Sequence, residues 1–170
     1  MAFIQPVERE DESYELMMVS HSVGSNASNY WTDIQLVQYL IGWVYDGASR
    51  GVGDWKQKMT PSELQSLPDP NTDFKALSRT AALIKRFQED SAKQGIRLYA
   101  DGRVDPAMGW RSSISSTPYT IIIANDYFES VIWEGEGSDP VDYVLNDFFA
   151  PDTLKGQLIK SRSEERVPVV

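Results

Sequence analysis

The chain of 170 residues has no cysteine and a single histidine, His21. The lack of cysteine excludes disulfide bonds, thiolate metal sites and cysteine nucleophiles, but it does not identify a cellular compartment. With one histidine, a metal site built from several histidines is impossible, and any Ser-His-Asp triad has to use His21. No nucleophile elbow accompanies His21, so we expect a structural or exposed histidine. The prediction is a protein that is not an enzyme and that uses no cofactor and no metal.

Basic residues are also scarce, with 16 Lys and Arg against 25 Asp and Glu, which leaves a net charge of -9. A charge of this sign repels a phosphate backbone, so we expect no nucleic-acid partner. No apolar run approaches the roughly 18–20 residues that a membrane span needs, and the start of the chain is acidic. We therefore expect no membrane span and no cleaved signal peptide. The predicted location is cytoplasmic, or exported without such a signal.

Apolar residues recur at helical spacing in several segments, which predicts a mainly α protein. The first helix has Thr32 as its N-cap and ends at Gly47. The clearest helix has Ser78 as its N-cap and is ended by Gly95. A further short helix is expected over residues 153–159.

Three other segments have helix-start signals. Thr60 and Glu63 form a capping box before a short helix. Residues 119–132 combine β-branched residues, which favour a strand, with a shared helical face, and we favour a helix. Asp139 begins another helix, whose apolar face includes Phe148.

Three sequence motifs follow one another in the chain and are informative as a set. They are SVGSNASN at 22–29 followed by DIQLVQYL at 33–40, then RTAALIKRFQ at 79–88, then DGRVDP at 101–106. Together they resemble the bacterial peptidoglycan-binding-domain-like proteins over residues 19–125. That family has an SVG-x-N-x-x-N segment, a DV-x-x-VQ-x-LL helix, a T-x-x-AI-x-x-FQ helix and a DGRVDP turn. The resemblance implies a small bundle of helices that recognises cell-wall glycan or stem peptide without catalysis.

The side chains of these motifs have structural roles of their own. Asp101 and Gly102 predict a tight turn, and Asp105, which precedes Pro106, is placed to bond its own backbone. The spacing of Asp101 and Asp105 is similar to that of calcium ligands, but turn formation is the better interpretation because a closing glutamate is missing. Gln38 and Gln88 are expected to bond loop backbone and so to hold the loop between their helices.

The predicted ligand-binding residues are Arg103, Trp110 and Arg111, in which two cations and a ring are suited to meeting a wall-peptide carboxylate. Thr80 and Gln88, from the family's T-x-x-AI-x-x-FQ helix, join them on the strength of the resemblance. Trp31 and Trp55 also fall in or beside predicted loops. Each of these tryptophans is either an exposed anchor for a partner or a ring that caps a small core.

A second functional interpretation starts from the charge distribution. Residues 126–152 hold eight acids and no Lys or Arg, which is either a solvated face or a docking site for a basic protein. Residues 73–80 also lack the DG and GP of the family's DG-x-x-G-P-x-T loop. The alternative function is therefore a protein-interaction role on the same scaffold, as a secretion-system accessory or adaptor, or as a toxin immunity protein.

The expected organisation has four parts. They are an N-terminal arm at 1–18, a peptidoglycan-binding-like helical domain at 19–133, an acidic helical extension at 134–160 and a disordered tail at 161–170. The predicted fold is thus mainly α, a small helical bundle of the peptidoglycan-binding-like type with a C-terminal helical extension. The expected partner is peptidoglycan or a basic protein.

Overall fold

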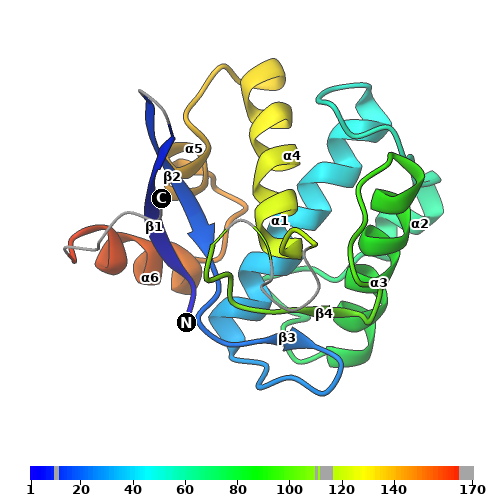
Figure 1. The fold of residues 1–170 in the computed structure, drawn as a ribbon, viewed down its shortest axis with the longest axis horizontal. Coiled ribbons are helices and arrows are strands. Elements are labelled where there is room, and N and C mark those ends of the chain that lie inside the picture. The colour runs from blue at the N-terminus through cyan, green and yellow to red at the C-terminus, as the bar shows by residue number, and fades with distance from the viewer. Residues whose placement is uncertain (10–11, 110, 112–116, 165–170) are drawn as a thin grey trace.

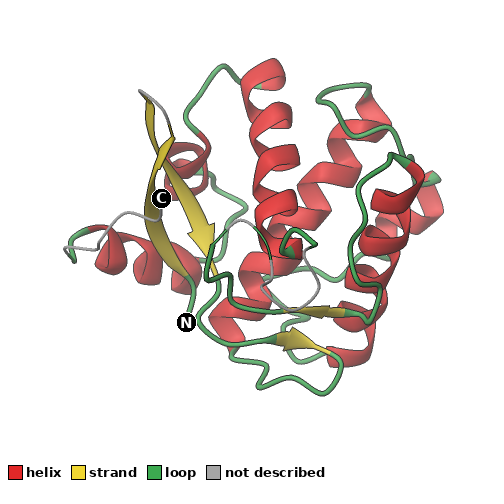
Figure 2. Cartoon of the chain, viewed as in Figure 1, coloured by secondary structure: helices red, strands yellow, loops and turns green. Residues whose placement is uncertain are grey.

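The computed structural model of the chain describes residues 1–9, 12–109, 111 and 117–164. Its elements are, in chain order, β1 (Phe3–Arg9), β2 (Glu12–Met18), β3 (Val23–Gly24), α1 (Trp31–Arg50), α2 (Pro61–Gln65), α3 (Leu77–Lys93), β4 (Arg103–Val104), α4 (Thr120–Gly135), α5 (Pro140–Asn146) and α6 (Asp152–Arg162). Within the described residues, helices dominate and the strands form two small antiparallel sheets, β1 with β2 and β3 with β4 (Figure 1, Figure 2). The mainly α prediction is confirmed.

Helix α1 is the central element and packs against α4, α3 and α6 (Figure 1). Side chains on all sides of α1 are buried, among them Leu36, Leu40 and Tyr45. The N-terminal half of α1 therefore lies inside the core, whereas Trp43 and Asp46 in its C-terminal half remain partly accessible. The other helices are therefore arranged around α1.

Both predicted ends of the first helix are wrong. Tyr30, and not Thr32, is the N-cap, and the helix continues past Gly47 to end at Gly51, whose φ of 78° is left-handed. Glycine is favoured there because it has no Cβ to clash in that conformation. Gly47 has a different role, since a Cβ built on it would lie 2.5 Å from Cγ2 of Val131 in α4. The missing side chain lets α1 and α4 approach each other closely.

The segment predicted as an N-terminal arm is a β-hairpin that contributes to the core. Strands β1 and β2 pair in antiparallel register from Phe3 opposite Met18. Helices occupy both outer edges of the hairpin. Ser161 Oγ of α6 accepts a hydrogen bond from the Ile4 amide at 2.9 Å. Asn125 of α4 bonds both the N–H and the C=O of Met17, at 3.0 and 2.8 Å. The side chains thus satisfy backbone groups that an edge strand otherwise leaves unpaired.

Most of the helix-start signals are confirmed. The Thr60–Glu63 capping box is present, residues 120–135 form a helix, and Asp139 accepts a hydrogen bond from the backbone of α5. Helix α3 begins at Leu77 with Ala76 as its N-cap, so the prediction of Ser78 is wrong by two residues.

The C-terminal part differs from the prediction in one respect that matters for the surface. Helix α5 ends at Asn146, so Phe148 does not belong to its apolar face and is instead 90% exposed. Helix α6 extends to Arg162, and Ser161 is buried. The start of the predicted disordered tail is therefore helical, while residues 165–170 lie outside the described residues.

A single cluster of buried hydrophobic side chains contains residues from segments that lie far apart in the sequence. It includes Ile4 of the hairpin, Leu40 of α1, Phe87 of α3, Phe128 of α4 and Leu158 of α6. None of the helices in the described part of the chain has the length and apolar character to cross a membrane.

Candidate functional site

Gln88, a predicted ligand residue, lies inside the protein and holds the DGRVDP turn. Its Nε2 donates to the Arg103 carbonyl at 2.8 Å and to Thr120 Oγ1 at 3.1 Å. Its Oε1 accepts from the Gly102 amide at 2.9 Å. The side chain is 1% exposed. Gln88 thus bonds loop backbone as expected, but in the turn after α3 rather than in the loop between α1 and α3, and no face of it is open to solvent.

Gln38 and Thr80 form a corresponding contact near the N-terminal end of α3. Gln38 Nε2 donates to Thr80 Oγ1 at 2.8 Å and to the Asp73 carbonyl at 3.2 Å. Thr80 Oγ1 in turn donates to the Ala76 carbonyl at 3.1 Å, and Thr80 is fully buried. The structure therefore places Thr80, like Gln88, in a buried hydrogen-bonded contact between helices and loop.

The turn itself has the predicted geometry. Gly102 has a φ of 73°, which glycine adopts readily. Asp101 Oδ1 accepts from the Arg103 amide at 2.9 Å. Asp105 was expected to bond its own backbone. Instead its Oδ1 accepts hydrogen bonds from Arg103 Nε at 2.6 Å and from Ser22 Oγ at 2.6 Å. The turn is thus fastened to the β3 segment by side chains.

The predicted cationic and aromatic group is only partly described. Arg103 is about one-third exposed but its guanidinium is engaged by Asp105, by Ser22 Oγ and by the Asn26 carbonyl. Arg111 is exposed and lies opposite Pro118 in an isolated β-bridge. Trp110 lies outside the described residues.

His21 has no triad geometry. Ser20 Oγ lies 2.8 Å from Nδ1 of the ring, and Asp33 Oδ2 lies 3.4 Å from the same nitrogen. In a catalytic triad the hydroxyl and the carboxylate contact different ring nitrogens. One nitrogen takes the hydroxyl proton, and the N–H of the other donates to the carboxylate, which orients the ring. The ring also stacks on Tyr30 at 5.2 Å. This arrangement supports a structural role for His21.

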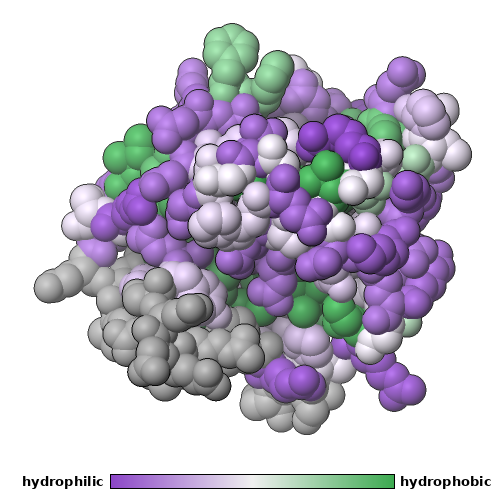
Figure 3. Space-filling model, turned by 90° about the horizontal axis from the view of Figure 1, so that it is seen from above, coloured by the Kyte–Doolittle hydropathy of each residue, from purple (hydrophilic) through white to green (hydrophobic). Residues whose placement is uncertain are grey.

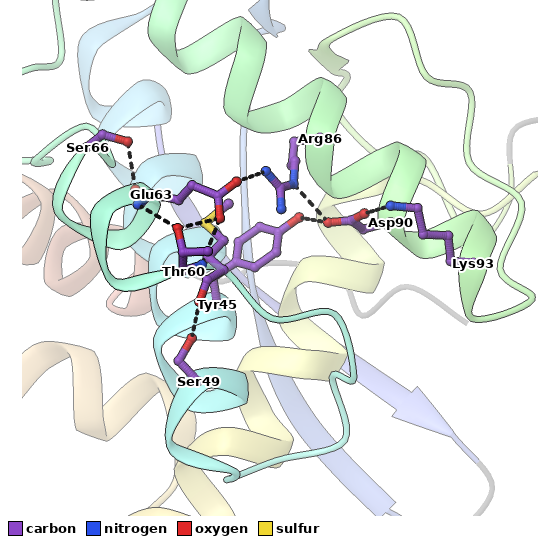
Figure 4. A network of polar contacts seen from close by, with 9 residues as sticks. Tyr45, Ser49, Thr60, Glu63, Ser66, Arg86, Asp90 and Lys93 are labelled. Carbon is purple, nitrogen blue, oxygen red and sulfur yellow. Dashed lines mark hydrogen bonds and ion pairs between the residues drawn. The ribbon is translucent and has the colours of Figure 1, made fainter.

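A charged network ties three helices together (Figure 4). Asp90 of α3 is 2% exposed and accepts hydrogen bonds from Tyr45 of α1 at 2.8 Å, from Arg86 at 3.2 Å and from Lys93 at 2.5 Å. Arg86 also reaches Glu63 of α2 at 2.7 Å. A buried carboxylate needs such partners because desolvation penalises its charge.

The pKa shifts in this network follow from the contacts. Burial by itself raises the pKa of Asp90, but the hydrogen bonds from Lys93, Tyr45 and Arg86 outweigh it and hold that pKa below its usual value. The hydrogen bonds from Arg86 and from Thr60, the N-cap of α2, lower the pKa of Glu63 to about 2. Each of these side chains has a partner within the network, which therefore links α1, α2 and α3.

The most conspicuous accessible feature is a pair of phenylalanines between α5 and α6. Phe148 is 90% exposed and Phe149 is 72% exposed, and their rings meet edge to face at 5.6 Å. The face seen in Figure 3 is mostly hydrophilic, with hydrophobic residues in small scattered groups. Adjacent exposed aromatic rings are typical anchors of protein interfaces.

The loop that carries these rings is held in place by side chains and backbone. Asp147 Oδ2 accepts from Tyr39 Oη at 2.5 Å, and its Oδ1 accepts from the Phe149 amide at 3.0 Å. Asn71 Nδ2 donates to the Phe149 carbonyl at 3.0 Å. Lys155 Nζ donates to the Asp147 carbonyl at 3.3 Å. The exposure of the rings is therefore built into the fold.

A groove of about 390 Å³ adjoins Phe149, between α1 and residues 67–71. A second hollow of about 350 Å³ adjoins Phe148 and includes Asp142 and Asp147 in its lining. The phenylalanine pair, with the groove beside Phe149 and the hollow beside Phe148, is called the Phe148–Phe149 face below.

The tryptophans divide between the two roles that the sequence left open. Trp55 is 1% exposed and stacks on Phe87 at 4.7 Å, so it is a core residue. Trp31 is 44% exposed and lies edge to face against Phe74.

The comparisons with known proteins add no assignment. No protein-family model, no curated protein and no solved structure matches this chain. The sequence reasoning missed the Phe148–Phe149 face because it continued the apolar stripe of α5 through Phe148. The signal that was present is the run of two phenylalanines between Asp147 and Pro151, which breaks helical spacing.

Proposed function

We propose that this protein is a non-catalytic protein-interaction module that binds a basic protein through its Phe148–Phe149 face. The observation that carries the proposal is the pair of adjacent rings, 90% and 72% exposed, on a loop held by hydrogen bonds. Two exposed aromatic rings are unfavourable in water, and burying them against a partner removes that penalty.

The surrounding charge supports a basic partner. Asp142 and Asp147 line the hollow beside Phe148, and Asp46 and Asp69 line the groove beside Phe149. Residues 126–152 hold eight acids and no Lys or Arg. Complementary charge steers association and selects against acidic partners. This role is the protein-interaction alternative, as an adaptor, a secretion-system accessory or a toxin immunity protein.

Recognition of cell-wall glycan or stem peptide, on a peptidoglycan-binding-like bundle, is the competing proposal. It rests on the motifs at 22–40, 79–88 and 101–106. Two of the residues proposed for it, Thr80 and Gln88, are buried, and Arg103 is paired within the protein. The accessible geometry therefore favours the protein partner.

The test uses the tagged full chain as bait, with the proteins encoded beside its gene as candidate partners. The double variant F148S/F149S removes the anchor, and Y99S/M108S, which replaces two other highly exposed hydrophobic residues, is the matched control. We expect a basic protein to co-purify with the wild type and the control but not with F148S/F149S. Equal recovery by all three contradicts the proposal. Sedimentation with peptidoglycan sacculi at low salt that survives F148S/F149S supports the competing one.

A further inference from the structure

The groove beside Phe149 has apolar walls and an acidic rim. Its lining residues are Gln38, Tyr39, Gly42, Trp43, Asp46, Leu67, Pro68, Asp69, Pro70, Asn71 and Phe149. The rings of Tyr39 and Trp43 lie 6.3 Å apart on one side. Asp46 and Asp69 supply the carboxylates. A volume of about 390 Å³ falls within the range of about 300–1,000 Å³ that is usual for ligand pockets.

The floor of the groove is open because α1 has a glycine there. A Cβ built on Gly42 would meet no atom within 4 Å. Glycine weakens the interior of a helix relative to alanine, so packing does not explain its presence. It contrasts with Gly47 in the same helix, where neighbouring atoms leave no room for a side chain. Gly42 thus keeps space free rather than permitting a close approach.

The groove also contains a buried acceptor without a donor. Gln38 is 1% exposed, and its Oε1 has no hydrogen-bond partner among the described residues. The orientation of the amide follows from its other contact, because Nε2 donates to the Asp73 carbonyl, which can only accept. A buried acceptor left unpaired is unfavourable. The oxygen is also shielded from solvent, so an occupant of the groove contacts it only if the wall around Gln38 moves.

The electrostatic field of this region is negative. Burial first, and then Asp147 and Glu136, raise the pKa of Tyr143 to about 12, while Arg50 lowers it by more than Asp46 raises it. The Tyr143 ring contacts the edge of Trp43 at 5.5 Å. An occupant with positive charge is therefore favoured, and an anionic one is repelled.

We infer that the groove over Gly42 receives a lysine or arginine side chain of the basic partner. The apolar stem of such a side chain fits between Trp43 and Leu67, since these side chains bury their methylene groups while the charged end stays hydrated or paired. The charged end has the carboxylate of Asp69 at the rim of the same groove, together with that of Asp46, which also pairs with Arg50.

Arg50 of the chain shows that this region accommodates a guanidinium. Its guanidinium lies 5.6 Å from the centre of the Trp43 ring, and Asp46 pairs with it at 2.8 Å. Cation–π attraction and a carboxylate partner are the contacts that the partner's cation would use. A second copy of this chain is disfavoured as the occupant, because each copy carries a net charge of -9 and acidic faces would meet.

The inference rests on the proposed function, and its test separates the two. The probe is a serine- and glycine-rich peptide with four arginines, compared with the same peptide in which citrulline, a neutral isostere, replaces each arginine. The variant G42L fills the groove from α1, and G156L, at a second open helical glycine in α6, is the matched control. Thermal unfolding of each variant shows that it is folded.

Nuclear magnetic resonance titration of the full chain measures binding. We expect the arginine peptide to shift the amide signals of Gly42 and the side chain of Gln38 in the wild type and G156L. G42L should weaken binding at least tenfold, and the citrulline peptide should not bind. Unchanged binding by folded G42L, or equal binding of citrulline, overturns the groove assignment.

The natural partner then decides between the two proposals. Loss of the partner in F148S/F149S but full retention in G42L leaves the proposed function intact and refutes the groove inference. Retention in both variants refutes both. A dimer of the wild type that G42L dissociates shows that a second copy is the occupant, and also overturns the inference.

Discussion

Replacing Gly47 by alanine tests how closely α1 and α4 pack. A Cβ at this position would lie 2.5 and 2.8 Å from the two γ carbons of Val131, which is 1% exposed. Alanine gains about 1 kcal/mol of helix propensity over glycine, but inserting a methyl group into a packed core costs about 1–3 kcal/mol. We expect the overpacking to win, so that G47A loses up to about 2 kcal/mol of unfolding free energy.

The same substitution at Gly42 provides the control, because no atom lies within 4 Å of the added methyl group. Only helix propensity changes there, so G42A should gain about 1 kcal/mol. Two identical substitutions five residues apart in one helix are thus expected to have opposite signs. Urea unfolding followed by circular dichroism measures both.

A double-mutant cycle identifies the clash. V131A alone should lose about 2 kcal/mol through lost burial. In G47A/V131A the methyl group of alanine has room, so the double variant should be more stable than the sum of the single effects predicts, by about 1–2 kcal/mol. Additive effects, or a stabilised G47A, would refute the reasoning about α1 and α4.

Two further predictions concern the polar contacts. The folded-state pKa of Glu63, about 2, lies below its ordinary value of 4.5, so its stabilising contribution is present above about pH 4.5 and is lost as the pH falls toward 2. In E63Q the melting temperature should therefore fall less steeply between pH 5 and pH 2 than in the wild type. An unchanged slope contradicts this. Q88A leaves the Gly102 amide without its acceptor, and urea unfolding should show a loss of about 2–3 kcal/mol. A loss below about 0.5 kcal/mol would mean that the turn holds without Gln88.

Sequence motifs predicted helix caps and turns correctly where residues close together in the chain decide the geometry. The capping box of Thr60 and Glu63 depends on residues three apart. The turn at Asp101 and Gly102 depends on one left-handed residue. The contact of Gln88 with loop backbone was also predicted, because a polar side chain on a buried helical face needs a partner.

The predictions failed where distant elements decide. Gly47 looks like a helix end in sequence, but Val131 of α4 explains it. The sequence left open whether Trp55 is a core ring or an exposed anchor, and its stacking on Phe87 of α3 at 4.7 Å makes it a core ring. Thr80 was expected to contact a ligand, but its hydroxyl is buried and accepts a hydrogen bond from Gln38 of α1.

Composition and periodicity alone determined that this is an acidic, mainly α protein with neither cysteine nor several histidines, because hydrophobic spacing and charge belong to the chain itself. Tertiary structure decided which of its unusual residues are accessible. Phe148 and Phe149 are exposed because α5 ends before them and Tyr39 of α1 holds the adjoining Asp147. The groove over Gly42 exists because residues 67–71 face α1 across it. Contacts between residues so far apart in the chain follow from how the elements pack, and no local pattern encodes them.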